Sequence, residues 1–210
     1  MLEESDASLI ESLRQFGEQT LAEILSANFE RLLRIAELRL DPRLTGRLDA
    51  ADVVQEAFLV ARERLPRFLR EPRVPVFVWL RGVVLDTLVD VHRRHLGAKM
   101  RDAGREVRLP DAIRPEATSI SLAAYLVGDL TSPSQAAIRE ETARRIDQVL
   151  ESMDPMDKEV LILRHFEQLS NDEVASVVGV KKAAASRRYM RALTRFREVV
   201  KTIPGCDFSP

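Results

Sequence analysis

The sequence predicts an all-α protein made of two small helical domains joined by a linker. Apolar residues recur at steps of three and four through most of the chain, which is typical of amphipathic helices. No alternating, strand-like run stands out, and aromatic residues make up only 5% of the sequence. Charge comes in blocks, with net charges of −6 over residues 1–60, +6 over 61–108, −5 over 109–160 and +4 over 161–210. Two basic segments therefore alternate with two acidic ones, and a polyanion would respond to the local patches rather than to the overall charge of −1.

Composition limits the classes of protein that need to be considered. The 210 residues are 45% apolar and 31% charged, as expected for a globular chain. Cys206 is the only cysteine, so a disulfide framework within the chain is excluded and a reducing cytoplasm is the expected setting. The N-terminus is acidic where a secretory signal would be basic, and no apolar run approaches the roughly 18 residues that a membrane helix needs. We expect a cytoplasmic protein without a membrane segment.

The first half of the chain predicts three helical stretches. Periodic apolar residues from Glu11 to Leu40 predict one or two amphipathic helices, which Asp41-Pro42 and Gly46 interrupt. Asp49 is placed to cap a helix that should run until Pro66. Pro72 and Pro75 mark a connector, after which residues 76–102 predict a long helix with a strongly basic end.

The second half begins with a linker. Residues 104–134 contain prolines, Gly128 and scattered Ser and Thr, although the run ISLAAYLV could form a short docking helix. A capping box of Ser132 and Gln135 predicts the next helix start, and Asp154-Pro155 predicts another. We therefore expect one domain over residues 1–103, the linker over 104–134, a second domain over 135–204 and a frayed tail over 205–210.

Two helices near the C-terminus have the arrangement of a helix-turn-helix. Ser170 and Glu173 form a second capping box, so a helix should begin at residue 171. Gly179 supplies a permissive turn residue, and a second helix should run from Lys181 to about Val200. A short helix, a tight glycine turn and a cationic second helix are typical of the motif that places its second helix in the major groove of DNA.

The cations of this second helix predict a division of roles. Lys182, Arg187 and Arg188 should face base edges, because arginine is the commonest specific reader of guanine. Lys181, Arg191 and Arg195 should instead meet phosphates. Two alternatives remain at this point: a plain helical hairpin with a charged surface, and a helical interaction protein that touches no DNA. Burial of the arginine surface by the protein's own helices would favour the latter.

An acidic and polar face on the helix after Asp49 is a second candidate site. Asp52, Gln55 and Glu56 fall at i, i+3 and i+4 and therefore share one exposed side. Such a face suits a basic protein partner, and the alternative is a solvated helix surface.

An enzyme is a further alternative. His92 and His95 lie three residues apart, with Asp86 and Asp90 nearby, in a pattern that could hold a metal. The HRRH context opposes metal binding, since the arginines add positive charge, and no catalytic motif accompanies it. We therefore expect no enzyme activity, no metal and no cofactor.

The segment from Leu150 to Arg197 resembles region 4 of the sigma-70 family, and especially of its small extracytoplasmic-function (ECF) type. The matching residues are Leu150, Pro155, Val160, Leu163, Arg164, Phe166, Leu169, Ser170, Glu173, Ala175, Gly179, Val180, Arg188, Arg191, Ala192 and Arg197.

A second resemblance lies upstream. The run DVVQEAF, which begins at Asp52, is similar to the D-hh-Q-E-hF signature of sigma region 2, where h is apolar. Trp79-Leu80 followed by Asp90 and Arg93-Arg94 resembles the WL…D…RR helix of that region. The two resemblances cover about three quarters of the chain in the right order.

The resemblance implies a sigma factor, which binds core RNA polymerase, brings it to promoter DNA and helps to open the duplex. The fold would be a region 2 helical bundle joined to a region 4 helix-turn-helix. An anti-sigma factor is a usual further partner in the family. The implied site residues are Asp52, Gln55 and Glu56 for core polymerase; Trp79, Asp86, Arg93, Arg94, His95 and Lys99 for the −10 element; and Lys181, Lys182, Ala184, Ser186, Arg187, Arg188 and Arg191 for the −35 element.

The chain departs from the family pattern at two places. Asp86 stands where many relatives have an asparagine, and a carboxylate there should repel phosphate. The run from Ala184 to Arg187 replaces a common Thr-Val-Lys-Ser, so the promoter sequence does not follow from the family. The alternative function is a helix-turn-helix transcriptional regulator with an N-terminal sensor or dimerisation module.

Overall fold

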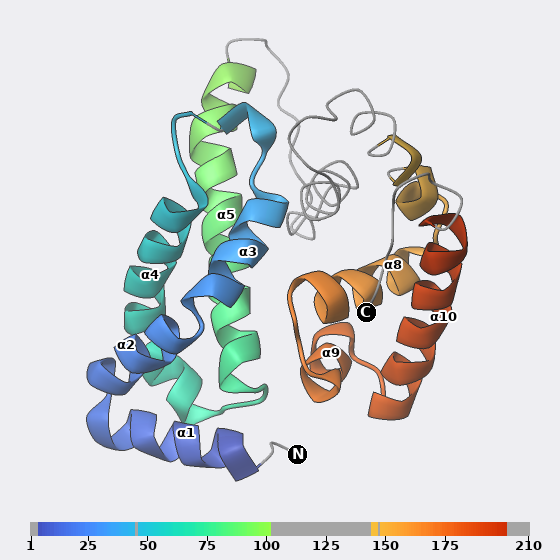
Figure 1. Ribbon diagram of the computed structural model, residues 1–210. Coiled ribbons are helices and arrows are strands. Elements are labelled where there is room, and N and C mark those ends of the chain that lie inside the picture. Colours follow the sequence, from blue (N-terminus) through green and yellow to red (C-terminus); the bar gives the residue numbers. More distant parts are fainter. Residues whose placement is uncertain (1–3, 45, 102–143, 147, 201–210) are drawn as a thin grey trace. The chain divides into compact units, whose positions relative to one another are not determined.

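The computed structural model describes residues 4–44, 46–101, 144–146 and 148–200, and in those residues the secondary structure is helical (Figure 1). The chain divides into two compact units, Met1–Glu116 and Ala117–Pro210. The prediction of an all-α protein is confirmed. The linker 104–134 with its Ser132 capping box and its ISLAAYLV run, and the tail with Cys206, lie outside the described residues.

Three helices open the first unit: α1 (Glu4–Phe16), α2 (Glu18–Ala27) and α3 (Phe29–Arg39). The prediction of one or two helices was wrong, because two residues break the periodic run. Gly17 adopts φ 53° and ψ −116°, which a side chain would disfavour. Asn28 donates from Nδ2 to the Ile24 carbonyl at 2.8 Å and so satisfies the end of α2. The apolar periodicity continues across both helix boundaries, so it does not show where one helix ends and the next begins.

The short 3-10 turn η1 (Pro42–Leu44) leads to α4 (Ala50–Arg70). The predicted N-cap is confirmed: the Asp49 carboxylate accepts from the Asp52 amide, and the Asp52 carboxylate accepts from the Asp49 amide in return. The predicted end at Pro66 was wrong. Pro66 lies on the exposed side of α4, where water can satisfy the freed carbonyl, and burial of Leu65 and Phe68 keeps the helix going.

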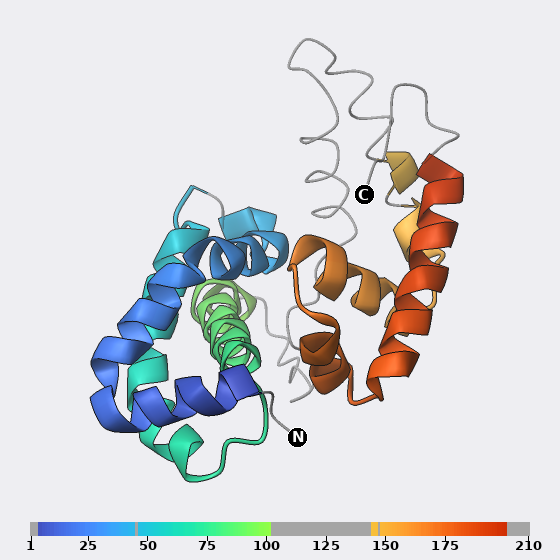
Figure 2. The ribbon, with the colours of Figure 1, turned by 60° about the horizontal axis from the view of Figure 1, so that its bottom comes forward.

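The long helix α5 (Val76–Arg101) forms the centre of the first unit. In Figure 2, which looks almost along its axis, the preceding helices lie around it. Most of α5 is apolar on several sides because α3 and α4 both pack against it. The fully buried side chains of this core include Leu21, Leu32, Ile35, Val53, Val54, Val76 and Leu88.

The second unit contains helical residues at 144–146 and 148–151, then α8 (Pro155–Leu161), α9 (Asn171–Val178) and α10 (Lys182–Val200). The predicted helix start at Asp154-Pro155 is confirmed, and the Asp154 carboxylate caps it by accepting from the amides of Met156 and Asp157. The chain does not continue α8 as one regular helix. Residues Ile162–Phe166 form a π-helical turn (η2), closed by the Glu167 amide donating to the Ile162 carbonyl at 3.0 Å.

The core of the second unit lies between α8, η2 and α10. Its fully buried side chains include Ile146, Leu150, Val160, Leu161, Leu163, Phe166, Ala185 and Phe196. Because these come from both sides of the turn at Gly179, the core fixes α10 relative to α8 and α9.

Candidate nucleic-acid and protein interfaces

The first candidate surface is the outer side of α4, near its N-terminus. Asp52 and Gln55 are exposed and Glu56 is half-buried. Asp52 has a structural role that its position in the sequence motif does not reveal, because its carboxylate closes the capping box with Asp49. The three predicted docking residues therefore lie on one helix face, with Gln55 the least engaged.

Leu59 extends this face and was missed by sequence reasoning. It follows Gln55 by one helical turn, and 51% of its surface is exposed. An exposed leucine beside polar groups is a common centre of a protein interface. The sequence does not distinguish Leu59 from the buried apolar residues of α4, since a leucine in an amphipathic helix is normally assigned to the core.

The second candidate surface is the C-terminal half of α5. Arg93, Arg94 and His95 are exposed there, whereas the side chain of Lys99 lies outside the described residues. Arg94 reaches back to α4 and pairs with Glu56 at 2.5 Å, and this hydrogen bond raises the pKa of the Arg94 guanidinium. Arg93 pairs more loosely with Asp90, at 3.6 Å. Glu56, which is predicted to bind polymerase, thus contacts Arg94, which is predicted to bind DNA.

Asp86 is paired with a cation of the neighbouring helix. Arg64 of α4 donates from Nη1 to the Asp86 carboxylate at 2.6 Å, and both side chains are 44% exposed. The pair reduces the negative charge that Asp86 would otherwise present. The predicted repulsion between Asp86 and DNA is correspondingly weaker than the sequence alone suggests.

Trp79 lies far from the basic end of α5. Its ring stacks on Phe68 of α4, with centroids 4.4 Å apart and planes 13° apart. Fourteen residues separate Trp79 from Arg93, which is about 21 Å along a helix axis. The structure does not bring Trp79 together with Arg93, Arg94 and His95.

His92 serves the fold. Its Nε2 accepts the Asp41 amide proton at 3.1 Å and so ties the turn after α3 to α5. Burial lowers the pKa of His92, while the nearby Asp41 carboxylate opposes that shift. Hydrogen bonding from Arg43 lowers the pKa of Asp41 to about 2. Over the described part of the chain, no three His, Cys, Asp or Glu side chains are grouped to hold a metal.

The third candidate surface is the helix-turn-helix of α9 and α10. The capping box of Ser170 and Glu173 is confirmed, and Gly179 ends α9 with φ 68°, in the left-handed region. The Asn171 side chain then joins the two helix starts, because its Nδ2 lies 3.1 Å from the Lys182 carbonyl and 2.8 Å from Ser186 Oγ. The turn is therefore held by side chains as well as by packing.

Several cations of α10 are engaged within the unit. Arg188 and Arg191 both bind Asp157 of α8, and Arg195 donates to the Ser152 carbonyl at 3.0 Å. Lys182 pairs with Asp172 of α9. The predicted role of Ser186 also has a competitor, since its hydroxyl is bound by Asn171.

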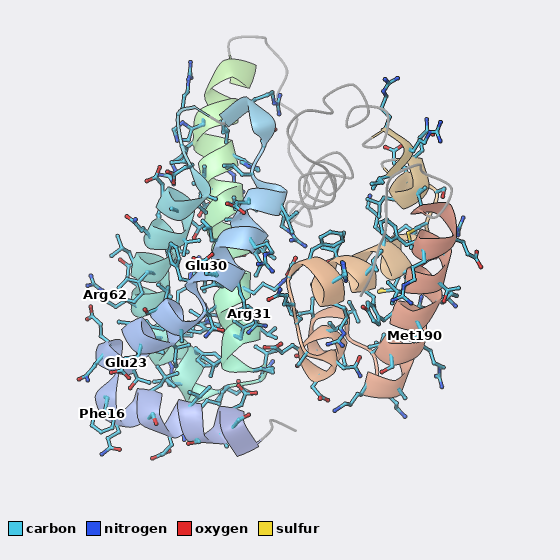
Figure 3. All side chains as sticks on the ribbon, in the orientation of Figure 1. Phe16, Glu23, Glu30, Arg31, Arg62 and Met190 are labelled. Atoms are coloured by element: carbon cyan, nitrogen blue, oxygen red, sulfur yellow. The ribbon has the colours of Figure 1, made fainter. Side chains whose placement is uncertain are left out.

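The outward side of α10 carries Ala183, Arg187, Met190 and Thr194, all exposed. The side chains of Lys181 and Arg187 form no hydrogen bond or ion pair with the residues that the structure describes. Met190, labelled on α10 in Figure 3, is 56% exposed and was missed by sequence reasoning. Ala184, another predicted contact, is half-buried on the flank of this side.

These features define an all-α, two-unit protein of the helix-turn-helix, DNA-binding class.

Comparisons with known proteins show which proteins this chain is similar to. The family model described as "Sigma-70, region 4" matches residues 143–196. The chain is 29% identical over 180 residues to the ECF RNA polymerase sigma factor SigD of Mycobacterium tuberculosis, covering 86% of this chain and 76% of that protein. It is 25% identical over 189 residues to the RNA polymerase sigma-H factor of Pseudomonas aeruginosa, covering 86% and 92%.

The solved structure of CnrH in complex with the cytosolic domain of CnrY has a similar fold. The TM-score is 0.52 at 18% identity, over 95% of this chain and 99% of that one. Over most of its length the chain is thus similar to ECF RNA polymerase sigma factors of the sigma-70 family, and its residues 143–196 match the region 4 model of that family. The alternative of a regulator with a sensor module is not favoured. No helix in the described part of the chain is long and apolar enough to cross a membrane.

Proposed function

We propose that the chain carries out promoter-specific initiation with α4 as its docking helix for core RNA polymerase, the end of α5 at the −10 element and α10 at the −35 element. The observation that supports this function best is that the outward side of α10 carries cations without partners among the described residues. Arg187 is exposed and Lys181 stands at the helix start, both outside the ion pairs that engage the neighbouring cations. An arginine on the free side of a recognition helix suits the acceptor edge of guanine in the major groove.

Met190 completes this reading surface. It follows Arg187 by three residues and therefore projects from the same side of α10. A thioether side chain suits the methyl group of thymine better than it suits a phosphate. We expect Lys181, Lys182 and Ser186 to contribute around the helix start, where the partners of Lys182 and Ser186 leave these two side chains less freedom than Arg187 has.

The docking helix is supported by the exposed group of Asp52, Gln55, Glu56 and Leu59. A hydrophobic centre with a polar and acidic rim is typical of a protein interface, and complementary charge speeds association with a basic partner. Leu59 supplies the apolar part and the other three supply the rim.

The −10 surface would use the exposed cations Arg93, Arg94 and His95, with Lys99 further along α5. Single-stranded DNA needs cations along its backbone and surfaces for unstacked bases. Trp79 and Asp86 already have partners in Phe68 and Arg64, so their direct contact with DNA would require those contacts to open.

Run-off transcription with purified core polymerase and a random promoter library tests the function. The wild-type chain should select a set of promoters, whereas Arg187→Ala should lose about 1–3 kcal/mol of discrimination at one position of the −35 element. Arg67→Ala, an exposed arginine on α4 outside the proposed surfaces, is the matched control and should keep the selection. Failure of the wild-type chain to direct initiation at any promoter would overturn the function itself.

Core binding is tested separately. Gln55→Ala combined with Leu59→Ala should weaken retention of core polymerase on the immobilised chain, because both side chains lie in the proposed contact. Arg67→Ala changes an exposed residue of the same helix outside the proposed surfaces and should retain core polymerase normally. Equal retention by all three proteins would remove α4 from the docking role without affecting the assignment of α10.

A protein inhibitor is a further proposed partner. The relative CnrH was solved with the cytosolic domain of CnrY, which supports an anti-sigma factor for this chain as well. Because core polymerase and promoter DNA are the partners, we also propose a cytoplasmic location, with the chemistry of RNA synthesis belonging to the polymerase.

A further inference from the structure

A buried carboxylate of α8 holds two arginines of the recognition helix. Only 9% of the Asp157 side chain is exposed. Arg191 donates to it from Nε and Nη2, both at 2.6 Å, and Arg188 donates from Nη1 at 3.0 Å. We call this group of Asp157, Arg188 and Arg191 the arginine clamp.

The electrostatics favour a persistent clamp. Hydrogen bonding from Arg191, and then from Arg188, lowers the pKa of Asp157 against the opposing effect of burial, so the carboxylate is charged at neutral pH. A buried charge that loses its partners is strongly unfavourable, so the arginines are not released freely. The fork of Arg191 is also bidentate, which fixes the plane of its guanidinium.

The clamp separates two kinds of cation on α10. Arg188 and Arg191 lie on the side that faces α8, and Asp154 adds a further carboxylate 3.8 Å from Arg188. Arg187 lies next in sequence but projects to the outward side, where it has no ion pair with the described residues. With Asp157 charged, the clamp carries one net positive charge instead of two, and Arg188 Nη1, Arg191 Nε and Arg191 Nη2 already have an acceptor.

We propose that Asp157 is a positioning residue for promoter recognition, which withholds Arg188 and Arg191 from DNA so that Arg187 dominates the reading of the −35 element. This inference rests on the proposed function of α10. A guanidinium binds any phosphate, so freely extended arginines would add sequence-independent affinity and reduce selectivity. The clamp would keep the two arginines as part of the fold and limit that contribution.

The test measures the salt dependence of promoter binding by the complete chain in complex with core polymerase. Asp157→Asn keeps the shape of the side chain but removes the charge that holds the arginines. Relative to wild type, the slope of log Kobs against log[salt] should steepen by about 1 to 2, because each released arginine can add a phosphate contact worth about 0.9. The affinity ratio between the selected promoter and a scrambled duplex should fall about threefold or more.

Glu198→Gln is the matched control. It also removes one negative charge from the second unit, at an exposed position of α10, and should leave both the slope and the affinity ratio unchanged. An equal effect of the two variants would attribute the change to general charge and would overturn the positioning role.

A second pair of variants keeps the question answerable if Asp157→Asn unfolds the second unit. Arg191→Gln should change the salt slope by less than about half of the change that Lys181→Gln causes, because the clamped arginine makes little phosphate contact. Equal losses of slope in the two variants would overturn the inference. If the wild-type chain directs transcription while these expectations fail, only the role of Asp157 falls; a wild-type chain without promoter activity would instead refute the proposed function.

Discussion

Single residues of this protein often serve the fold and a surface at the same time. Asp52 belongs to the proposed docking face but also closes the cap of α4. Ser186 belongs to the recognition helix but also accepts from Asn171. Substitution of such residues changes stability and binding together, which is why Gln55 and Arg187 are the more informative positions.

His92 should make the first unit sensitive to mild acid. Its pKa is lowered from the ordinary value of 6.5 by burial, so the neutral form is favoured in the folded state. Above pH 6.5 the folded and unfolded states are both neutral at this position and the stabilisation is fully present. As the pH falls below 6.5 the unfolded state takes up the proton first, and the stabilisation is lost until folded His92 also titrates.

Chemical unfolding between pH 7.5 and 5 measures this effect. His92→Gln can still accept the Asp41 amide proton but does not titrate, so the first unit should lose less stability on acidification than in wild type. His95→Gln, one turn further along the exposed side of α5, is the control and should behave as wild type. The same pH dependence in wild type and His92→Gln would contradict the expectation.

The sequence predicts which residue types a surface offers better than it predicts which of these side chains form ion pairs within the fold. The cationic second helix followed from a glycine turn and a capping box, both local patterns. The partner of Arg188 lies 31 residues away in α8, and no spacing rule connects the two. Met190 and Leu59 were missed because exposure depends on which side of a helix packs, and apolar residues are normally assigned to the packed side.

At the scale of elements, capping residues at helix starts account for much of the agreement between sequence and structure. The starts of α4, α8 and α9 were predicted from Asp49, Asp154 and Ser170, because a cap satisfies free amides through a side chain only two or three residues away. Helix ends were predicted less well. Pro66 did not end α4, since an exposed proline followed by buried residues can remain inside a helix.

The cap of α9 should have a measurable effect on the second unit. Ser170→Ala removes the acceptor for the Glu173 amide and should lower the free energy of unfolding by about 1 kcal/mol. Ser176→Ala, inside the same helix, is the control and should have little effect, since alanine is favoured in helix interiors. Denaturant titrations followed by circular dichroism give both values; equal stability of Ser170→Ala and wild type would argue against the cap.

At the scale of the whole molecule, the two units have separate cores, and a cavity in one should spare the other. Leu163 is fully buried in the second unit and Leu32 in the first. Leu163→Ala should cost about 2–5 kcal/mol through lost burial and the remaining cavity. In this variant, amide hydrogens should exchange faster in α8 and α10 and at an unchanged rate in α5.

Leu32→Ala is the reciprocal variant and should accelerate exchange in the first unit alone. Hydrogen exchange of the full chain, read by mass spectrometry, follows both units in one sample. Acceleration of both units by either variant would show that they unfold as one cooperative body, contrary to this expectation.

The pair of Arg64 and Asp86 has an evolutionary consequence. These positions lie 22 residues apart on neighbouring helices and share one salt bridge, so their charges balance as a unit. Restoring an asparagine at position 86 alone would leave an uncompensated guanidinium beside the α5 surface. A lineage that exchanges one of these residues is therefore expected to exchange the other soon afterwards, and the two columns should change together in an alignment of close homologues.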